Sequence, residues 1–161
     1  MKFVIKSLSE HDADQIATWQ YEAPYSIYNP SMKDISALLE PNNRYYSVQH
    51  ESGRLFGYCC FGREATVPGG EYTFSEPDVV DVGLGMNPEL VGNGLGKVFV
   101  EAILQFAATA FKPSRFRVTI AEFNLRSQKV FLGLGFTKTG SFDREGDGMR
   151  FVQLQRASGT E

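Results

Sequence analysis

The residues with the clearest chemical potential form a short glycine-rich segment, Gly92–Lys97, with glycine at every second position. The segment lies between Val79–Met86, which predicts a strand, and Val98–Phe111, a strongly apolar stretch that predicts a helix. Glycines let main-chain N–H groups face inward without obstruction, and the helix start adds the positive end of its dipole. The segment is therefore competent to cradle an anion such as a phosphate.

Two common nucleotide-binding motifs do not fit this segment. A P-loop requires a glycine five positions before Gly96 and a Ser or Thr after Lys97, but valine occupies both positions. A dinucleotide fingerprint that starts at Gly92 or at Gly94 lacks its third glycine. A plain strand-to-helix turn remains an alternative, although such a turn needs one or two glycines and not three in alternation.

Cysteine nucleophiles and metal ligands are poorly supported by the sequence. Cys59 and Cys60 are adjacent in an expected strand, so their side chains point to opposite faces and no disulfide is expected between them. With only His11 and His50 available, the chain has no metal-ligand spacing, and it has no G-x-S-x-G elbow. We expect no metal and a reduced, cytoplasmic protein.

Composition and charge limit the partners of this chain of 161 residues. Sixteen Lys and Arg against nineteen Asp and Glu give a net charge of −3, so no excess of cations is available to displace counterions from nucleic acid. The N-terminal apolar run is too short for a signal peptide, and Glu101 and Gln105 interrupt the longest apolar helix. We therefore expect one domain over residues 1–161, with no nucleic-acid or membrane partner.

The first elements that position the glycine segment alternate between strand and helix. Phe3–Ser7 predicts a strand, Ser9 is expected to cap a helix that runs through Trp19, and Ser31 to cap a second helix. The aromatic stretch from Trp19 to Pro30 joins these helices. It is expected either to line a substrate or to be a plain surface loop anchored by its tyrosines.

Strand and helix patterns continue to the end of the chain. A hairpin of Tyr45–Gln49 and Leu55–Phe61 is expected around Gly53, and turn residues at 67–70 and 75–77 mark a long connection to Val79–Met86. After the apolar helix, the pattern predicts a strand over 115–123, a helix from Asn124 to a left-handed Gly135, and strands over 136–143 and 149–154. This order predicts an α/β (α+β) fold with a mostly antiparallel first half.

The glycine segment resembles the acyl-CoA pyrophosphate loop of the GCN5-related N-acetyltransferase (GNAT) family. That loop is written Q/R-x-x-G-x-G/A and follows a strand ending in V-x-P. Gly94 and Gly96 match the two small positions, and Met86 and Pro88 match the strand end. Val91 replaces the usual Gln or Arg, which removes a polar side chain but leaves the backbone donors.

A second segment is similar to the family's next motif, N-x-x-A-x-x-L-Y-x-x-x-G-F. Asn124, Gly135 and Phe136 match this motif, while Ser127 and Phe131 stand where Ala and Tyr are common. The two motifs follow each other in the family's order, on the expected strand-loop-helix-strand-helix background.

The resemblance implies a GNAT-like fold and acetyl-CoA as cosubstrate. The sheet would be mixed and mostly antiparallel, with six to seven strands flanked by about four helices. The fourth and fifth strands would splay apart and hold the pantetheine arm in the gap. The residues that the resemblance assigns to CoA are Leu84, Met86, Val91, Gly92, Asn93, Gly94, Leu95, Gly96, Lys97, Asn124 and Phe131.

The resemblance also implies the reaction, in which a primary amine attacks the thioester directly in a ternary complex. The amine would belong to a small molecule, a peptide or a protein. The family's Tyr often protonates the departing sulfur, and Phe131 cannot, so the acid is unassigned. Asp81 is the first candidate for the base, followed by Asp78 and Glu122, and each is also explained as a solvated strand-end carboxylate.

The lack of an assigned acid and the uncertain base affect which amine is the easier acceptor. Deprotonating a Lys-type amine at pH 7 costs about 4.6 kcal/mol, whereas an α-amine costs only about 1 kcal/mol, so a low-pKa acceptor is easier. The departures at Val91 and Phe131 also favour an alternative, a catalytically silent acyl-CoA-binding module of the same fold. Either protein is expected to be a monomer or a homodimer.

Overall fold

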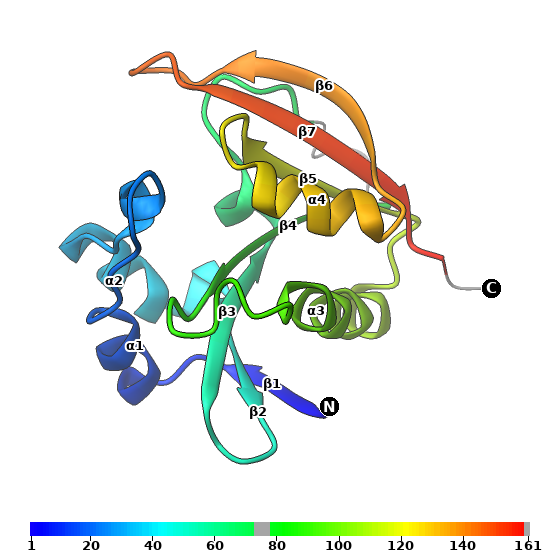
Figure 1. The fold of residues 1–161 in the computed structure, drawn as a ribbon. Helices are drawn as coiled ribbons and strands as arrows, with labels where there is room; N and C mark the ends of the chain where they lie inside the picture. The colour runs from blue at the N-terminus through cyan, green and yellow to red at the C-terminus, as the bar shows by residue number, and fades with distance from the viewer. Residues whose placement is uncertain (73–77, 160–161) are drawn as a thin grey trace. The chain divides into compact units, whose positions relative to one another are not determined.

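Residues 1–72 and 78–159 are described by a computed structural model, drawn in Figure 1. The chain divides into two units, one formed by Met1–Cys60 with Leu84–Gly96, the other by Phe61–Gly83 with Lys97–Glu161. The turn expected at residues 75–77 lies outside the described residues.

Three antiparallel strands belong to the first unit. β1 (Phe3–Ser7) pairs with β2 (Tyr46–His50), and β2 pairs with β3 (Leu55–Phe61). Gly53 closes the β2–β3 hairpin at φ +94°, and its N–H donates to the carbonyl of His50 at 2.8 Å. Only glycine adopts this backbone conformation readily, so the predicted hairpin is confirmed together with its turn residue.

Two helices of the first unit begin at the predicted capping serines. α1 (Glu10–Ile16) and α2 (Met32–Leu39) each begin with a capping box, in which Ser9 or Ser31 exchanges hydrogen bonds with the Asp three residues later. Short 3₁₀ turns follow, η1 (Tyr25–Tyr28) and η2 (Pro41–Asn43).

The prediction that the first helix runs through Trp19 is wrong. α1 ends at Ile16, and Trp19 lies in the turn that follows, where its N–H donates to the Ile16 carbonyl at 3.0 Å. Trp19 is nevertheless buried with Ile16, Leu38 and Leu55. Its apolar character reflects burial in this core rather than helical periodicity.

Four strands form the sheet of the second unit. The parallel pair joins β4 (Val79–Met86) to β5 (Arg115–Ala121), with Val79–Asp81 opposite Arg115–Arg117. β5 pairs antiparallel with β7 (Arg150–Ala157), which pairs antiparallel with β6 (Thr137–Asp143). The helical elements are η3 (Gly62–Ala65), α3 (Gly96–Phe111) and α4 (Leu125–Gly133).

Two strands end two or more residues away from the prediction. β5 stops at Ala121 and not at Phe123, because a turn closed by the Asn124 N–H on the Ala121 carbonyl (2.9 Å) leads into α4. β7 extends to Ala157, which lies opposite Arg115, so the last strand accompanies β5 along its whole length.

The hydrogen-bonded order of the strands is β1-β2-β3-β4-β5-β7-β6. With seven strands and the helices α1 to α4 among the described residues, the predicted mixed, mostly antiparallel fold is confirmed. The splay of β4 and β5 and the single domain stay predictions. Within the described residues, no helix has both the length and the apolarity needed to cross a membrane.

Candidate functional site

The buried side chain of Asn87 holds the chain in place directly after β4. The sequence pattern did not predict a role for this residue. The main-chain N–H of Asn87 donates to the Phe56 carbonyl (2.8 Å), and its Nδ2 donates to the Leu55 carbonyl (3.1 Å). Its Oδ1 accepts from the N–H of Glu89 (3.0 Å). Asn87 therefore ties both Leu84–Met86 and the start of the glycine loop to β3.

The glycine loop between β4 and α3 depends on two left-handed backbone conformations. Gly92 and Gly94 adopt φ values of +85° and +74°, and an added Cβ at either position would meet no atom within 4 Å. Gly96 is the first residue of α3, and Lys97 is exposed. The main-chain N–H groups of Gly94 and Leu95 donate no hydrogen bond to another described residue. These donors and the start of α3 remain available for an anionic ligand.

The aromatic stretch between α1 and α2 is attached to the end of β4 by Tyr21. The Tyr21 hydroxyl donates to the main-chain carbonyl of Met86 at 2.6 Å, and its N–H donates to Oδ1 of Asn29 at 2.7 Å. Burial, with a smaller contribution from Tyr58, raises the pKa of Tyr21 well above its ordinary value. This contact places the stretch beside the strand for which the family resemblance implies a contact with pantetheine.

A second tyrosine lies against the same strand. An ideal Cβ on Gly85 would stand 2.5 Å from Cζ and 2.7 Å from the hydroxyl oxygen of Tyr58, so glycine is needed for this approach. The Tyr58 ring stacks on Trp19 (centroids 6.0 Å apart, 25° between planes). Burial, followed by smaller contributions from Cys60 and Asp34, raises the pKa of Tyr58 to about 12.

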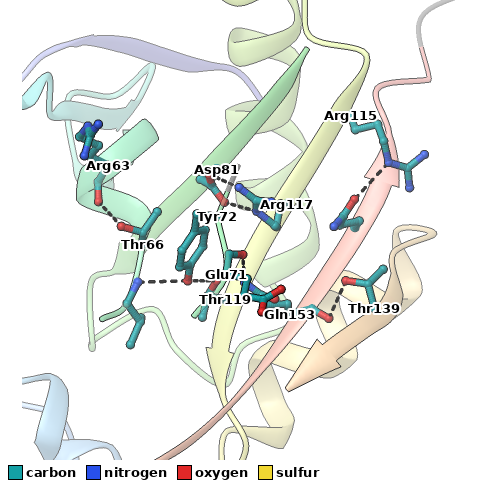
Figure 2. A network of polar contacts seen from close by, with 12 residues as sticks. Arg63, Thr66, Glu71, Tyr72, Asp81, Arg115, Arg117, Thr119, Thr139 and Gln153 are labelled. Carbon is teal, nitrogen blue, oxygen red and sulfur yellow. Dashed lines mark hydrogen bonds and ion pairs between the residues drawn. The ribbon is translucent and has the colours of Figure 1, made fainter. Parts of the chain in front are cut away.

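Asp81, the predicted base, lies in a buried ion pair. Its two carboxylate oxygens accept from Nε and Nη2 of Arg117 at 2.6 and 2.8 Å, as Figure 2 shows. The side chains are 4% and 7% exposed. The solvated alternative considered for Asp81 is therefore wrong, and each of its two oxygens already accepts a hydrogen bond from the guanidinium.

The sequence pattern did not identify Arg117 as a site residue. It predicted only that Phe116, Val118 and Ile120 share one apolar face of the strand. Those three residues are buried as expected. Arg117 points to the opposite face, and the parallel register places it directly opposite Asp81. Asp81 and Arg117 each place a charge inside a largely apolar strand. Opposite charges in two such neighbouring strands are the sequence signal that could have predicted this ion pair.

Tyr72 covers the ion pair, as Figure 2 also shows. The guanidinium carbon of Arg117 lies 4.9 Å from the centre of the Tyr72 ring, a cation–π contact. The Tyr72 hydroxyl shares a hydrogen bond with Oγ1 of Thr119 (2.7 Å) and accepts from the N–H of Val67 (3.1 Å). The network attaches the connection after β3 to β5 and further encloses Asp81.

The other two candidate bases, Asp78 and Glu122, are exposed, which agrees with the alternative that they are solvated carboxylates at strand ends. The side chain of Asp78 is solvent-exposed, while its main-chain carbonyl accepts from Ser114 and Arg115. Glu122 is 57% exposed and 3.8 Å from Nε of Arg150.

The second motif forms the start and the core of α4. Asn124 is its N-cap, and its Oδ1 accepts from the N–H of Ser127 at 3.1 Å. Phe131 is 2% exposed and packs edge-on against Phe136, with centroids 5.1 Å apart. Gly135 has φ +92°, which confirms the predicted left-handed end of the helix.

The two cysteines of β3 are buried thiols that form no disulfide with a described residue. Burial, with a smaller contribution from Cys60, raises the pKa of the Cys59 thiol above its ordinary value, which disfavours the thiolate that a nucleophile needs.

The sequence profile described as "Acetyltransferase (GNAT) domain" matches residues 2–137, more than half of the chain. The chain belongs to the GNAT acetyltransferase family. The suspected resemblance and the expectation of an acetyltransferase are thereby confirmed, and the GNAT match includes every residue assigned above to CoA. No curated protein sequence matches the chain.

Solved structures of GNAT enzymes have the same fold. A GNAT acetyltransferase from Bacillus anthracis is 14% identical, with a TM-score of 0.74 over 99% of this chain and 97% of that one. The aminoglycoside acetyltransferase AAC(6')-Ib, in complex with ribostamycin and coenzyme A, is 18% identical, with a TM-score of 0.77 over 98% and 94%. A phosphinothricin acetyltransferase from Sinorhizobium meliloti, in complex with acetyl-CoA, is 18% identical, with a TM-score of 0.67 over 98% and 89%. At these identities the likeness establishes the GNAT fold alone.

Proposed function

We propose that the protein transfers an acetyl group from acetyl-CoA to a primary amine by direct attack in a ternary complex. The observation that carries the proposal is the loop from Gly92 to Gly96 after β4. Its two left-handed glycines, its unused amides and the start of α3 suit a pyrophosphate, and it lies inside the matched GNAT span.

The family pattern then assigns a path for acetyl-CoA. The pyrophosphate would bind the amides of Gly92–Lys97, and the pantetheine arm would bond to the main chain near Leu84 and Met86. Asn124 would contact the arm, and Phe131 would lie beside the sulfur. The aromatic stretch that Tyr21 attaches to Met86 would line the acceptor side.

We infer that Asp81 holds Arg117 in place and does not take the proton from the amine. Both of its oxygens accept from one guanidinium, and the pair is almost fully buried. Without an assigned base or acid, the best substrate is an amine of low pKa, such as an α-amine, because it is easier to deprotonate near pH 7 than a Lys-type amine. An amine acceptor is supported by the aminoglycoside and phosphinothricin acetyltransferases of the same fold.

We further propose that residues 1–161 act as one domain in the cytoplasm, as a monomer or a homodimer. The adjacent buried thiols of Cys59 and Cys60, which are not joined in a disulfide, support a reducing compartment.

The test combines binding and turnover on the purified chain. Calorimetry compares acetyl-CoA with ATP, and thiol release from acetyl-CoA is followed with a panel of α-amines and Lys-type amines at pH 7. We expect acetyl-CoA to bind in preference to ATP and thiol release to be fastest with the α-amines. Binding without release across the whole panel would instead identify the silent acyl-CoA module, and preferred ATP binding would overturn the proposal.

A further inference from the structure

The hydroxyl groups of two tyrosines near the end of β4 differ in their partners. The Tyr21 hydroxyl donates to the Met86 carbonyl. The Tyr58 hydroxyl makes no hydrogen bond to any other described residue. Every buried polar side-chain atom among these residues has a partner, so the unpaired Tyr58 oxygen is not completely buried, in agreement with the partial exposure of the residue. The hydroxyl is therefore open to a further hydrogen bond.

The ring that carries this hydroxyl is held firmly. Tyr58 rests on Gly85 and stacks on Trp19, and Tyr45 packs against it at a centroid distance of 6.2 Å. Trp19 is itself part of the buried core of the first unit. A hydroxyl fixed in this way costs little reorganisation when it binds a ligand, which is the property of an effective transition-state donor.

We propose that the Tyr58 hydroxyl donates a hydrogen bond to the carbonyl oxygen of the acyl group during transfer. The inference rests on the proposed function, which lays the thioester arm along Leu84–Met86. Gly85 lies between these two residues, and Tyr21 brings the acceptor stretch to Met86. The acyl carbon, where arm and acceptor meet, is thus expected at the level of the Tyr58 hydroxyl.

The chemical step balances with Tyr58 as a donor that keeps its proton. The amine nitrogen forms a bond to the acyl carbon, and negative charge gathers on the carbonyl oxygen. The C–S bond then breaks, the charge leaves with sulfur, and the proton lost by the amine passes through solvent to the thiolate. Tyr58 stabilises the oxygen while the charge is there, and Phe131 has no hydroxyl with which to do so.

The acid–base properties of Tyr58 fit a donor better than a proton carrier. With a pKa of about 12, the phenol stays protonated over the whole working pH range. Its removal is therefore expected to lower kcat by a similar factor at every pH from 6 to 9. Removal of one such donor costs about 10²-fold or more in other enzymes, and we expect a loss near the lower end, because water can partly replace an accessible hydroxyl.

The experiment uses Tyr58→Phe, which keeps the ring, and Tyr72→Phe as the control. Tyr72→Phe also removes one phenol oxygen, but the hydrogen bonds that it removes are those to Thr119 and Val67. Acetyl-CoA labelled with ¹³C at the thioester carbonyl is bound to each protein, and its stretching band is measured by isotope-edited infrared spectroscopy. In the wild type and in Tyr72→Phe the band should lie below that of free acetyl-CoA, and in Tyr58→Phe it should return toward the free value.

Kinetics and a second variant complete the test. Tyr58→Phe should lower kcat with an unchanged KM for the amine and an unchanged shape of the pH profile. Gly85→Ala, whose methyl group would displace the Tyr58 ring, should move the band in the same direction. An unchanged band in Tyr58→Phe, or a loss confined to the KM for the amine, would overturn the inference while leaving acetyl transfer intact. A wild type that neither binds nor consumes acetyl-CoA would instead overturn the proposed function.

Discussion

Asp81 and Arg117 show how a charged side chain in a strand is accommodated by a specific partner. Each charge is almost fully buried, and two hydrogen bonds with nearly ideal distances compensate for the lost hydration. Tyr72 covers the guanidinium from one side. Removal of one charge leaves the other buried without compensation, which is the most costly way to change such a pair.

Asp81→Asn is therefore expected to lower the free energy of unfolding by about 3–5 kcal/mol, as measured by urea denaturation. Glu122→Gln removes an exposed carboxylate in the turn directly after β5 and should change stability by no more than about 1 kcal/mol. The double variant Asp81→Leu/Arg117→Met should be more stable than Asp81→Asn, because neither charge remains. An Asp81→Asn protein with wild-type stability and no turnover would instead make Asp81 the base.

Phe131→Tyr tests the position that the family pattern places beside the CoA sulfur. The new hydroxyl should raise turnover or shift the pH profile of kcat. Because Phe131 is 2% exposed and packs on Phe136, burying the hydroxyl should also lower stability by about 1–3 kcal/mol. A stability loss with no change in turnover or in the pH profile would show that position 131 does not lie next to the sulfur.

At the scale of elements, glycines determine two turns of the first unit. The two turns have similar backbone conformations, but only one of them is expected to bind CoA. Gly94 in the loop before α3 and Gly53 in the β2–β3 hairpin have φ values of +74° and +94°. Neither has any atom within 4 Å of an added Cβ. Alanine at either position is thus disfavoured by backbone conformation alone, by about 1–2 kcal/mol.

This match makes Gly53→Ala a control for Gly94→Ala. Both variants should lose similar stability in urea denaturation. Gly94→Ala alone should weaken the binding of CoA, measured by calorimetry, because the strained loop presents its amides poorly. Binding of pantetheine, which lacks the pyrophosphate, should be the same in both variants. Equal CoA affinity in the two variants would rule out the loop as the pyrophosphate site.

At the scale of the whole molecule, stability is expected to depend on pH mainly on the alkaline side. The pKa values of Tyr21, Tyr58 and Cys59 are all raised by burial, and all three residues belong to the first unit. The native state therefore retains protons that the unfolded chain releases near the ordinary values of 10.0 for Tyr and 9.0 for Cys. The stability from these neutral groups is complete below about pH 8 and is lost as pH rises toward 12.

The free energy of unfolding should accordingly fall steadily between pH 8 and 11. The fluorescence of Trp19, the single tryptophan, reports unfolding of the core against which Tyr58 packs. Tyr58→Phe removes one of the three groups and should make the decline shallower above pH 10. A free energy that stays constant from pH 8 to 11 would contradict the assignment of buried neutral groups.

The sequence by itself determined the elements and the loop, because their signals are local. The capping boxes at Ser9 and Ser31, the hairpin at Gly53 and the left-handed Gly135 depend on a few neighbouring residues. The glycine spacing likewise excluded two nucleotide motifs and pointed to the GNAT family, which the match over residues 2–137 confirms. The end of α1 was predicted wrongly, because Trp19 is apolar at a helical spacing from Ile16 although it lies beyond the helix.

Only the tertiary structure decided which side chains meet. Asp81 and Arg117 are 36 residues apart, and the Tyr21 hydroxyl reaches a carbonyl 65 residues away. These contacts depend on strand register and on packing, which no local pattern specifies. The sequence could therefore name Asp81 as a carboxylate in a suitable strand, but the register of β4 and β5 placed it against a buried guanidinium. In the same way, the packing of Tyr58 on Gly85 left an unpaired hydroxyl beside the strand expected to bind acetyl-CoA.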